Sequence, residues 1–294
     1  MKYDKLFETA KIGSLTLKNR FIMGAMGVGF AEMNGNPTDR TVAYYEERAK
    51  GGYALIITEV TRVQDTEFCT PLEPSLGSDK FIPGWKKVTD AVHAQGAYIF
   101  PQLHQPGRQY TKAILGHDTS APSPIACPVF DETPHELTTE EVWDNIHMFG
   151  DAAVRAKKAG FDGVEIHAGH GYLVQQFLSQ FSNRRFDEFG GSIENRARFA
   201  CEICKDIKKK CGEDYPVIIK LSGEEKVPGG MTISDTKIIA KYLEEAGYDA
   251  IEVTICNYAS LDWMSAPEDE PMGFNAYNAE KIKEGVHIPV AAID

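Results

Sequence analysis

The sequence has little positive charge and no long apolar run, and these absences exclude whole classes of function. It holds 31 Lys and Arg against 43 Asp and Glu, a formal net charge of −12, with no basic cluster beyond Lys208–Lys210. Such a chain does not attract nucleic acid, so we expect no nucleic-acid partner. It has no stretch of about 18 apolar residues, so we expect no membrane-spanning helix. The N-terminus lacks an apolar signal core, which favours the cytoplasm.

Cysteine is also sparse: the chain has six, scattered along 294 residues and without the density of a disulfide framework. Cys201 and Cys204 form a C-x-x-C pair that could serve a metal or redox site. A helix is the favoured interpretation, because the run CEICKDIKKK has helical spacing and no second C-x-x-C follows it.

What the chain does have is an alternation of apolar strand-like runs with amphipathic helical segments. The predicted strands are Arg20–Met26, Ala54–Val60, Tyr98–Leu103, Phe161–Ala168, Val217–Ser222, Ala250–Thr254 and Ile288–Ala292. The predicted helices are Thr41–Lys50, Pro83–Gln95, a segment from the Thr138/Glu141 capping box to Lys158, Ile193–Cys211 and Ser234–Ala246. This order is typical of a parallel α/β sheet.

Two parallel folds fit these strands. An open doubly wound sheet usually carries a G-x-G-x-x-G motif after an early strand, whereas Gly24, Gly27 and Gly29 have a different spacing. We therefore predict one α/β domain over residues 1–294, a (β/α)8 TIM barrel truncated after its seventh strand.

The segment after the fourth predicted strand carries the strongest functional signal, because it holds His167, His170 and Tyr172 where the chain leaves the sheet. Chemistry in parallel α/β proteins lies at such strand ends. Two imidazoles and a phenol can bind a substrate oxygen and supply a proton. Zinc binding is a weaker alternative, because a third ligand such as Glu165 alternates to the other face of the strand. Two structural loop histidines are the plainer alternative.

Other segments are candidates for ligand contact. Gly24–Gly27 could let a flat ligand approach the backbone or could serve tight barrel packing. Gln102 matches a group such as a flavin pyrimidine edge, although a solvent-facing loop amide is the simpler interpretation. Lys220 ends an apolar run, where a charge must be paired or must serve an anionic ligand or a reduced flavin. The polar run Asn183–Arg196 predicts a structured loop that leads into a helix.

Together these residues resemble the Old Yellow Enzyme family of FMN-dependent ene-reductases. The similarity is strongest to its branch of 2-enoate, 2,4-dienoyl-CoA and bile-acid-inducible reductases, and it covers essentially the whole chain. It rests on LTLKNRFIMGAM, YYEERAKGGYALIITE, PQLHQPGR, VIIKLSGEE and, most specifically, GVEIHAGHGYLVQQFLSQFSNRRFDEFGGSIENRARF. It implies hydride transfer from reduced FMN to the β-carbon of an α,β-unsaturated carboxylate, thioester or enone, with NADH or NADPH as the reductant.

The resemblance also implies a role for each site residue. Residues implied to contact FMN are Ala25, Met26, Gly27, Glu59, Gln102 and Lys220. His167 and His170 would hold the substrate oxygen, and Tyr172 would donate the proton. Three positions depart from the family pattern: proline is usual at Ala25, histidine at Gln105 (with His104 displaced by one), and arginine at Lys220, where lysine keeps the charge but loses the planar fork.

The resemblance implies further segments beyond Asp294. These are an eighth βα unit that binds the FMN phosphate, then a 4Fe-4S motif and FAD and NAD(P) domains. We therefore expect residues 1–294 alone to bind FMN weakly, and to self-associate or to need a chain that supplies the missing barrel segment. A non-catalytic remnant that holds no FMN and, less favoured, a metal-dependent barrel hydrolase are the alternative functions.

Overall fold

The computed structural model describes residues 3–68, 70–264, 268 and 270–293. The chain divides into two compact units. Unit 1 contains Met1–His104, Met148–Ile166 and Ile207–Val217. Unit 2 contains Gln105–His147, His167–Asp206 and Ile218–Asp294.

The strands of unit 1 form consecutive parallel pairs. The pairs join β3 (Ile22–Met23) to β4 (Leu55–Arg62), β4 to β5 (Tyr98–His104), and β5 to the start of β8 (Val164–Ala168). Nearly every position of β4 and β5 is buried. Such continuous burial is typical of parallel strands whose two faces are both covered.

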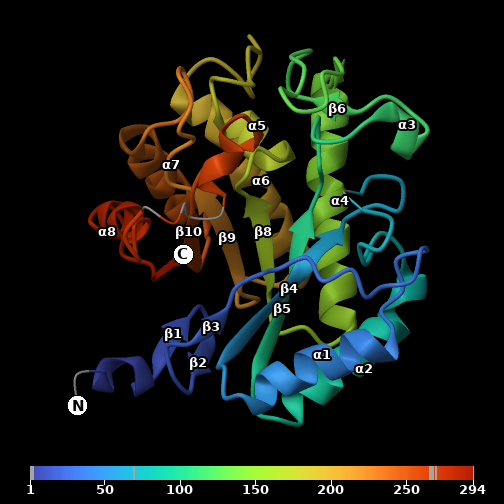
Figure 1. Cartoon of the computed structure of the whole chain (residues 1–294), viewed down its shortest axis with the longest axis vertical. Coiled ribbons are helices and arrows are strands. Elements are labelled where there is room, and N and C mark those ends of the chain that lie inside the picture. Colours follow the sequence, from blue (N-terminus) through green and yellow to red (C-terminus); the bar gives the residue numbers. More distant parts are fainter. Residues whose placement is uncertain (1–2, 69, 265–267, 269, 294) are drawn as a thin grey trace. The chain divides into compact units, whose positions relative to one another are not determined.

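Two helices of unit 1, α1 (Asp39–Lys50) and α2 (Ile82–His93), lie side by side along β4 and β5 (Figure 1). A capping box begins α1, in which Thr38 and Thr41 each accept the other's backbone N–H and so satisfy amides of the first turn. In α2, the fully buried Trp85 packs edge-on against another aromatic ring of the unit. These contacts fix the helices against the strands.

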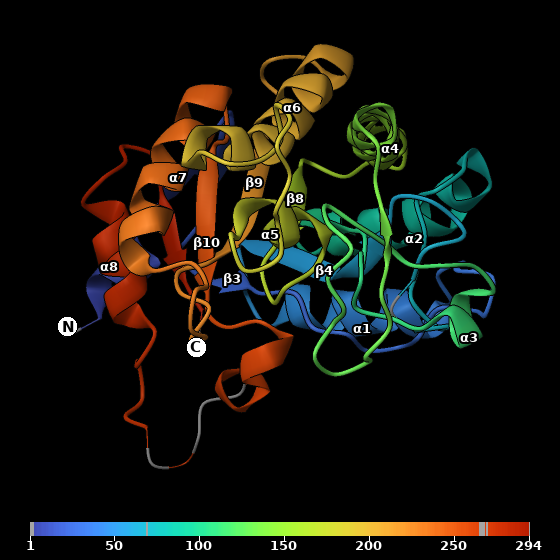
Figure 2. The same ribbon diagram turned by 90° about the horizontal axis from the view of Figure 1, so that it is seen from above.

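The sheet of unit 2 has β10 (Ala250–Thr254) between β9 (Val217–Ser222) and β11 (Val290–Ala292), all parallel. Helix α8 (Ala276–Lys283) packs against β10 and β11, and α7 (Ile233–Ala246) packs against α8 (Figure 2). The strands carry apolar residues that these helices cover, which is the βα arrangement that the sequence predicts.

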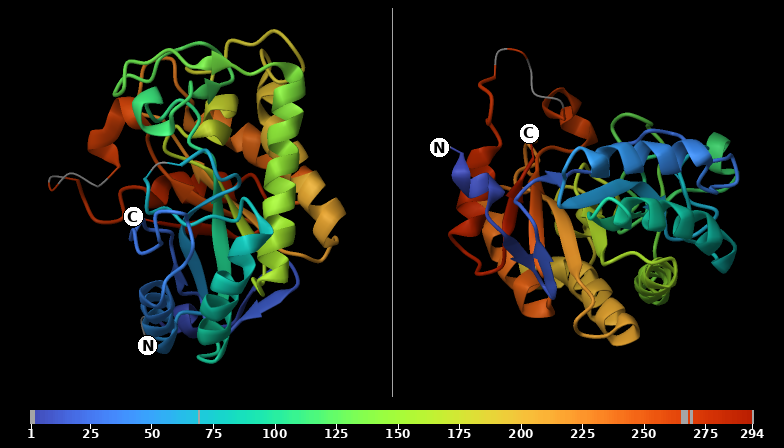
Figure 3. Two further views of the ribbon diagram at one scale, coloured as in Figure 1. Left: turned by 90° about the vertical axis from the view of Figure 1, so that its right-hand side faces the viewer. Right: turned by 90° about the horizontal axis from the view of Figure 1, so that it is seen from below.

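Helix α4 (Thr139–Lys158) has 20 residues and is seen lengthwise in the left view of Figure 3. The predicted capping box is present before it: the Glu141 carboxylate accepts the N–H of Thr138, and the Thr138 hydroxyl accepts the N–H of Glu141. Helix α6 (Ile193–Cys211) has the predicted bounds. The other elements are η1 (Asp4–Phe7), β1 (Ala10–Ile12), β2 (Leu15–Leu17), η2 (Asp79–Phe81), α3 (Lys112–Leu115), β6 (Ser120–Ala121), β7 (His135–Glu136), α5 (Leu173–Leu178) and η3 (Tyr258–Trp263).

The predicted strands and helices are present, with changed boundaries at several ends. The first strand shrinks from Arg20–Met26 to the two residues of β3, because the following backbone turns away and donates its amides to a carboxylate of β4. The antiparallel hairpin of β1 and β2 and the helix α8 were not predicted. The hairpin strands have three residues each, too few to show an alternating pattern.

The C-x-x-C pair lies within α6, as the helical interpretation predicts. Cys204 is fully buried, and burial raises the pKa of the Cys201 thiol to about 12, which keeps it protonated and unreactive. Within the described residues no three His, Cys, Asp or Glu side chains gather as a metal site would require, and Cys69 lies outside these residues. The described part of the chain likewise has no helix of the length and apolarity needed to cross a membrane.

Candidate active site

In unit 1, Glu59 of β4 supplies a buried acceptor beside the loop that follows β3. Its Oε2 accepts the backbone N–H of Val28 at 2.8 Å and of Gly29 at 3.0 Å. Its Oε1 is buried and has no hydrogen-bond partner among the described residues. Burial raises the pKa of Glu59, although the two N–H groups oppose this shift. A carboxylate oxygen in this state can accept a hydrogen bond from a ligand.

The loop itself leaves its backbone accessible. Ala25 is half-buried, whereas Met26 is 55% exposed and Gly27 is exposed. Apart from its chain neighbours, no described residue has an atom within 4 Å of a Cβ built on Gly27. Tight packing, one of the two explanations for the small residues here, therefore does not apply at Gly27. Open space beside the backbone fits the approach of a flat ligand.

Gln102 is not a solvent-facing loop amide, which corrects the simpler interpretation. It lies within β5, is 2% exposed, and donates its Nε2 to Glu165 Oε2 at 2.6 Å. The carboxylate fixes the nitrogen end of the amide, so the amide oxygen is the end that can accept from a ligand. The sequence suggested only one role for Glu165, that of a zinc ligand. In the structure it accepts a hydrogen bond from Gln102.

In unit 2 the structure brings His167, His170 and Tyr172 together. The ring centroids of His167 and His170 are 5.2 Å apart, and those of His167 and Tyr172 are 5.0 Å apart. His170 has a left-handed backbone with φ of 58°, a conformation that non-glycine residues rarely adopt. The chain turns sharply here, and this turn places the three rings in one cluster.

His170 is held by the ends of the two neighbouring strands of its unit. Its Nε2 lies 2.9 Å from Thr254 Oγ1, and its backbone N–H donates to Ser222 Oγ at 3.2 Å. Burial, reinforced by the positive charge of Lys220, lowers the pKa of His170 to about 3. The imidazole is therefore neutral at physiological pH and can offer one N–H to an oxygen.

Lys220 is paired within the sheet. Its Nζ lies 2.8 Å from Glu252 Oε1, and both side chains are 4% exposed. The two residues are direct neighbours in the register of β9 and β10. The sequence left two explanations for a charge in this strand: pairing with another side chain, or contact with a ligand. The structure shows the pairing.

Tyr172 has a second phenol beside it. Its hydroxyl lies 2.9 Å from that of Tyr258, the first residue of η3, and their rings meet edge-on. Tyr172 also occupies the N-cap position of α5. The sequence analysis missed Tyr258 because it lies in a loop with no diagnostic spacing. It also missed the roles of Ser222 and Thr254, although both are polar residues at the ends of predicted strands, where a site was expected.

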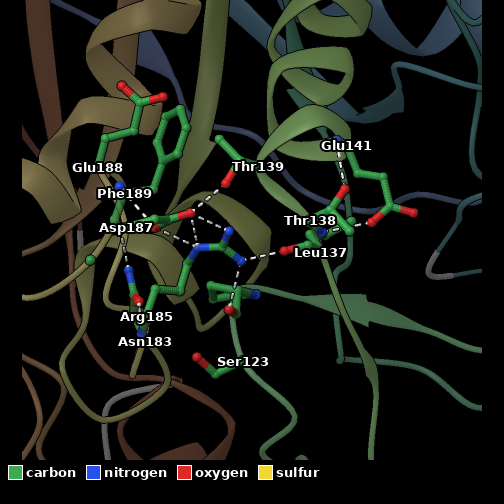
Figure 4. Close-up of polar contacts among 12 residues, drawn as sticks. Ser123, Leu137, Thr138, Thr139, Glu141, Asn183, Arg185, Asp187, Glu188 and Phe189 are labelled. Atoms are coloured by element: carbon green, nitrogen blue, oxygen red, sulfur yellow. Dashed lines mark hydrogen bonds and ion pairs between the residues drawn. The ribbon is translucent and has the colours of Figure 1, made fainter.

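The polar run after α5 forms the predicted structured loop before α6, and Figure 4 shows Arg185 and Asp187 at its centre. Arg185 binds Asp187 through Nη2 at 2.5 Å and through Nε at 3.0 Å, and it donates to the carbonyls of Pro122 and Leu137. Asn183 donates to the carbonyls of Phe177 and Phe189. The hydrogen bonds and the salt bridge of these side chains stabilise the loop.

The electrostatics of Asp187 support this structural role. Burial alone would raise the pKa of its carboxyl, but hydrogen bonds from Arg185, Thr139 and the N–H of Phe189 outweigh burial and lower the pKa to about 2. The most specific sequence motif therefore has two parts. Its first part carries the three rings of His167, His170 and Tyr172, and its second part is a loop that the Arg185–Asp187 salt bridge stabilises.

His104 and Gln105, where the sequence departs from the family pattern, are both buried. His104 is the last residue of β5 and is 1% exposed. Gln105 is 2% exposed; its Oε1 accepts the N–H of Gly107 at 2.7 Å, and its Nε2 lies 3.5 Å from Asn145 Oδ1. The side chain of Gln105 thus stabilises its own turn.

Comparison with known proteins defines the class. Residues 5–294 match the model of the NADH:flavin oxidoreductase / NADH oxidase family. The chain belongs to this family, which confirms the resemblance drawn from the motifs. The chain is 42% identical over 295 residues to an NADH oxidase of Thermoanaerobacter brockii, covering 99% of this chain and 45% of that protein. It is 40% identical to a cinnamate reductase of Clostridium sporogenes, covering 98% and 47%.

A shorter relative is matched over most of its length: an NADPH dehydrogenase of Bacillus subtilis, 39% identical, with 98% of this chain and 83% of that protein covered. Among solved structures, a 2-naphthoyl-CoA reductase in complex with 2-naphthoyl-CoA has a TM-score of 0.92 at 32% identity, covering 99% and 46%. Morphinone reductase has a TM-score of 0.84 at 30% identity, covering 98% and 79%. These matches confirm the predicted α/β barrel fold class. The chain spans less than half the length of the NADH oxidase and the cinnamate reductase.

Proposed function

We propose that this protein is an FMN-dependent ene-reductase that uses NADH or NADPH to reduce the C=C bond of an α,β-unsaturated carboxylate, thioester or enone. The observation that carries the proposal is the cluster of His167, His170 and Tyr172 at the end of β8, with a neutral His170. Family membership supplies the redox class, and the cluster supplies the groups for binding and protonating the substrate.

Three features of unit 1 fit a flavin ring. The Glu59 Oε1 has no protein partner among the described residues, the backbone at Gly27 faces open space, and the Gln102 amide is held by its nitrogen. Ala25, Met26 and Gly27 would lie against the ring, and Gln102 would bind the pyrimidine edge. Lys220, which the resemblance also implies as a flavin contact, belongs to unit 2 and is paired there with Glu252. Bound FMN supplies the hydride, which is chemistry that no side chain provides.

The unit 2 cluster would act on the substrate. His167 and His170 would donate hydrogen bonds to the carbonyl or carboxylate oxygen, so that negative charge developing on this oxygen during reduction is stabilised. Because His170 is neutral, it has a single N–H; if its Nε2 accepts from the Thr254 hydroxyl, this N–H is on Nδ1 and can be offered to the substrate. The Tyr172 hydroxyl would then protonate the α-carbon, with Tyr258 accepting or donating at 2.9 Å.

The names of the relatives favour conjugated acids and thioesters as substrates. One relative is a cinnamate reductase, and one solved relative binds 2-naphthoyl-CoA. Cinnamate has its C=C bond between a phenyl ring and the carboxylate, and 2-naphthoyl-CoA has an aromatic ring attached directly to the thioester carbonyl. We propose cinnamate and its thioester as the first substrates to test.

The test is a sequence of spectra on the purified protein. We expect the protein with FMN to show the visible band of bound oxidised flavin, which NADH or NADPH bleaches without oxygen and cinnamate restores, with formation of the saturated acid. Weak binding of FMN is expected for residues 1–294 alone, so the spectra are recorded with excess FMN. A protein that leaves even a large excess of FMN unbound would contradict the proposal and support the non-catalytic alternative. A colourless protein with stoichiometric zinc and hydrolytic activity would support the barrel hydrolase.

A further inference from the structure

We propose that Glu225, a residue of unit 2 with no assigned role, is a positioning residue that fixes Tyr172 and His170 for proton transfer. It does so through the side chains of Gln175 and Asn257. The proposal rests on the proposed function of Tyr172 as the proton donor.

Glu225 is a buried carboxylate surrounded by donors. It is 1% exposed. Its Oε1 accepts from Gln175 Nε2 at 2.9 Å and from Asn257 Nδ2 at 3.1 Å. Its Oε2 accepts from the Ser179 hydroxyl at 2.5 Å and from the Met231 N–H at 2.6 Å. All four donors are neutral groups, and a buried carboxylate needs them to offset the loss of hydration.

One branch of the network leads to the catalytic loop. Gln175, in the first turn of α5, uses its Oε1 to accept the N–H of Gly171 at 2.8 Å and the hydroxyl of Ser222 at 3.0 Å. The Ser222 oxygen in turn accepts the N–H of His170. The Gln175 amide can fill these roles only in one orientation, with its nitrogen toward Glu225. Glu225 thereby holds the backbone N–H groups of His170 and Gly171, directly before Tyr172.

A second branch leads to the neighbouring phenol. Asn257 donates to Glu225, and its side-chain oxygen accepts the N–H of Ala259 at 2.8 Å, which starts η3. Tyr258 follows Asn257 directly, and its hydroxyl contacts that of Tyr172. A single carboxylate oxygen of Glu225 therefore holds the supports of both phenols. Moving either support changes the distance between the hydroxyls, and small errors in the position of a reacting group are costly.

The other oxygen of Glu225 provides a matched control. Ser179, the C-cap residue of α5, donates its hydroxyl to Oε2, and the same hydroxyl accepts the N–H of Phe181 at 3.1 Å. Ser179→Ala removes one hydrogen bond from the same buried carboxylate but leaves the branches to Gln175 and Asn257. Glu225→Gln preserves the size of the side chain but removes the charge and one acceptor oxygen.

The experiment follows the oxidative half-reaction of the flavin-loaded protein with cinnamate. We expect Glu225→Gln to slow this step at least about tenfold, with NADH reduction of the flavin unchanged and with an increased solvent deuterium isotope effect. Ser179→Ala should leave both half-reactions close to those of the parent. Gln175→Leu breaks the same branch and replaces Glu225→Gln if that variant does not fold.

A double-mutant cycle separates positioning from general damage. In the Tyr172→Phe background, Glu225→Gln should cause a clearly smaller further loss than in the parent, because the part of its effect that acts through the phenol is already absent and only the part that acts through His170 is left. An equal loss with and without the Tyr172 hydroxyl would overturn the role of Glu225. If instead Tyr172→Phe alone leaves the oxidative half-reaction intact, the proposed function fails, whatever Glu225 does.

A second readout needs no flavin. With tyrosine labelled at Cζ, the NMR signal lost in Tyr172→Phe identifies Tyr172. We expect this signal to shift or broaden in Glu225→Gln and to stay unchanged in Ser179→Ala. An unmoved Tyr172 signal in a folded Glu225→Gln variant would contradict the proposal.

Discussion

The loop after β3 in unit 1 and the loop after β8 in unit 2 differ in how their polar groups are used. Beside the first, Glu59 keeps a buried oxygen without a partner among the described residues, and the backbone at Gly27 faces open space. Around the second, the side-chain amides of Gln175 and Asn257 both donate to the buried carboxylate of Glu225. We propose that the first region gains its missing contacts from a ligand, whereas the side chains of the second region are already held by one another in the free protein.

This difference predicts that substitutions in the two regions act on different quantities. Changes in the preorganised region should lower the stability of the fold, because each removes a partner from a buried polar group. Changes beside the open loop should spare the fold and weaken the binding of the cofactor.

The largest loss of stability is expected for Glu252→Ala. This change leaves the Lys220 ammonium buried without its carboxylate, which typically costs about 3–5 kcal/mol. Asp90→Ala is the matched control, because the Lys86–Asp90 pair is more than half exposed and is worth less than about 0.5 kcal/mol. Urea unfolding measures both. A loss below about 1 kcal/mol for Glu252→Ala would show that Lys220 does not depend on this partner.

His170 should make the fold sensitive to acid. Its pKa falls from an ordinary 6.5 to about 3 in the folded protein, so the unfolded chain binds a proton more readily between these values. The free energy of unfolding should therefore decrease as the pH falls from 6.5 toward 3, by up to about 1.4 kcal/mol per pH unit. His170→Asn should remove this part of the slope.

His93 of unit 1 should give the opposite pH dependence of the free energy of unfolding, and it serves as the control. Its hydrogen bond to Asp162 raises its pKa, so its contribution is complete below the unfolded value near 6.5 and is lost as the pH rises through the folded value. Midpoints of urea unfolding, measured from about pH 4 to about pH 9, compare the two variants with the parent. If His93→Asn and His170→Asn change the slope in the same direction, the account of their surroundings is wrong.

A smaller effect is expected for Asp187→Asn in the salt-bridged loop. The folded pKa of Asp187 is about 2 and its ordinary value is 3.8; because the carboxylate is partly exposed and screened by solvent, we expect a contribution of about 1 kcal/mol at neutral pH. This contribution is present above pH 3.8 and is lost as the pH falls toward 2. Thermal unfolding at pH 7 and at pH 3 should show a difference between parent and variant that narrows in acid. A difference that grows in acid would contradict the assignment.

The smallest effect on stability is expected for Glu59→Gln. The amide oxygen can still accept the N–H groups of Val28 and Gly29, so the free energy of unfolding should change by less than about 1 kcal/mol. FMN affinity should fall about tenfold or more, because a charged acceptor is lost. Fluorescence titration with FMN measures this. Unchanged affinity would mean that the free oxygen of Glu59 does not serve the flavin.

Some elements were predictable because their signals are local. Strands β9 and β10 have the predicted bounds, since their apolar runs are uninterrupted, and α6 begins and ends as its helical spacing indicates. The grouping of His167, His170 and Tyr172 followed from their place at a strand end. The pairing of Lys220 could also have been predicted, because Glu252 occupies the middle of the next predicted strand.

Other parts of the site were not predictable, because their function depends on contacts between distant residues. Gln175 lies in LVQQFL, where it looks like an interruption of an apolar helix, and the partners of its side chain lie up to 81 residues away. Glu225 follows a strand in a loop rich in charge and glycine, which usually indicates solvent exposure. Only the folded chain shows that this carboxylate is buried and bonded.

The most direct test of the division between the two regions is a comparison of the two half-reactions in Tyr172→Phe. Stopped-flow absorbance would follow reduction of the bound flavin by NADH and then its reoxidation by cinnamate, with Tyr277→Phe on the exposed face of α8 as the control. The account predicts that reoxidation slows by roughly 10²–10⁴ in Tyr172→Phe while reduction keeps the parent rate. An equal loss in both half-reactions would contradict it.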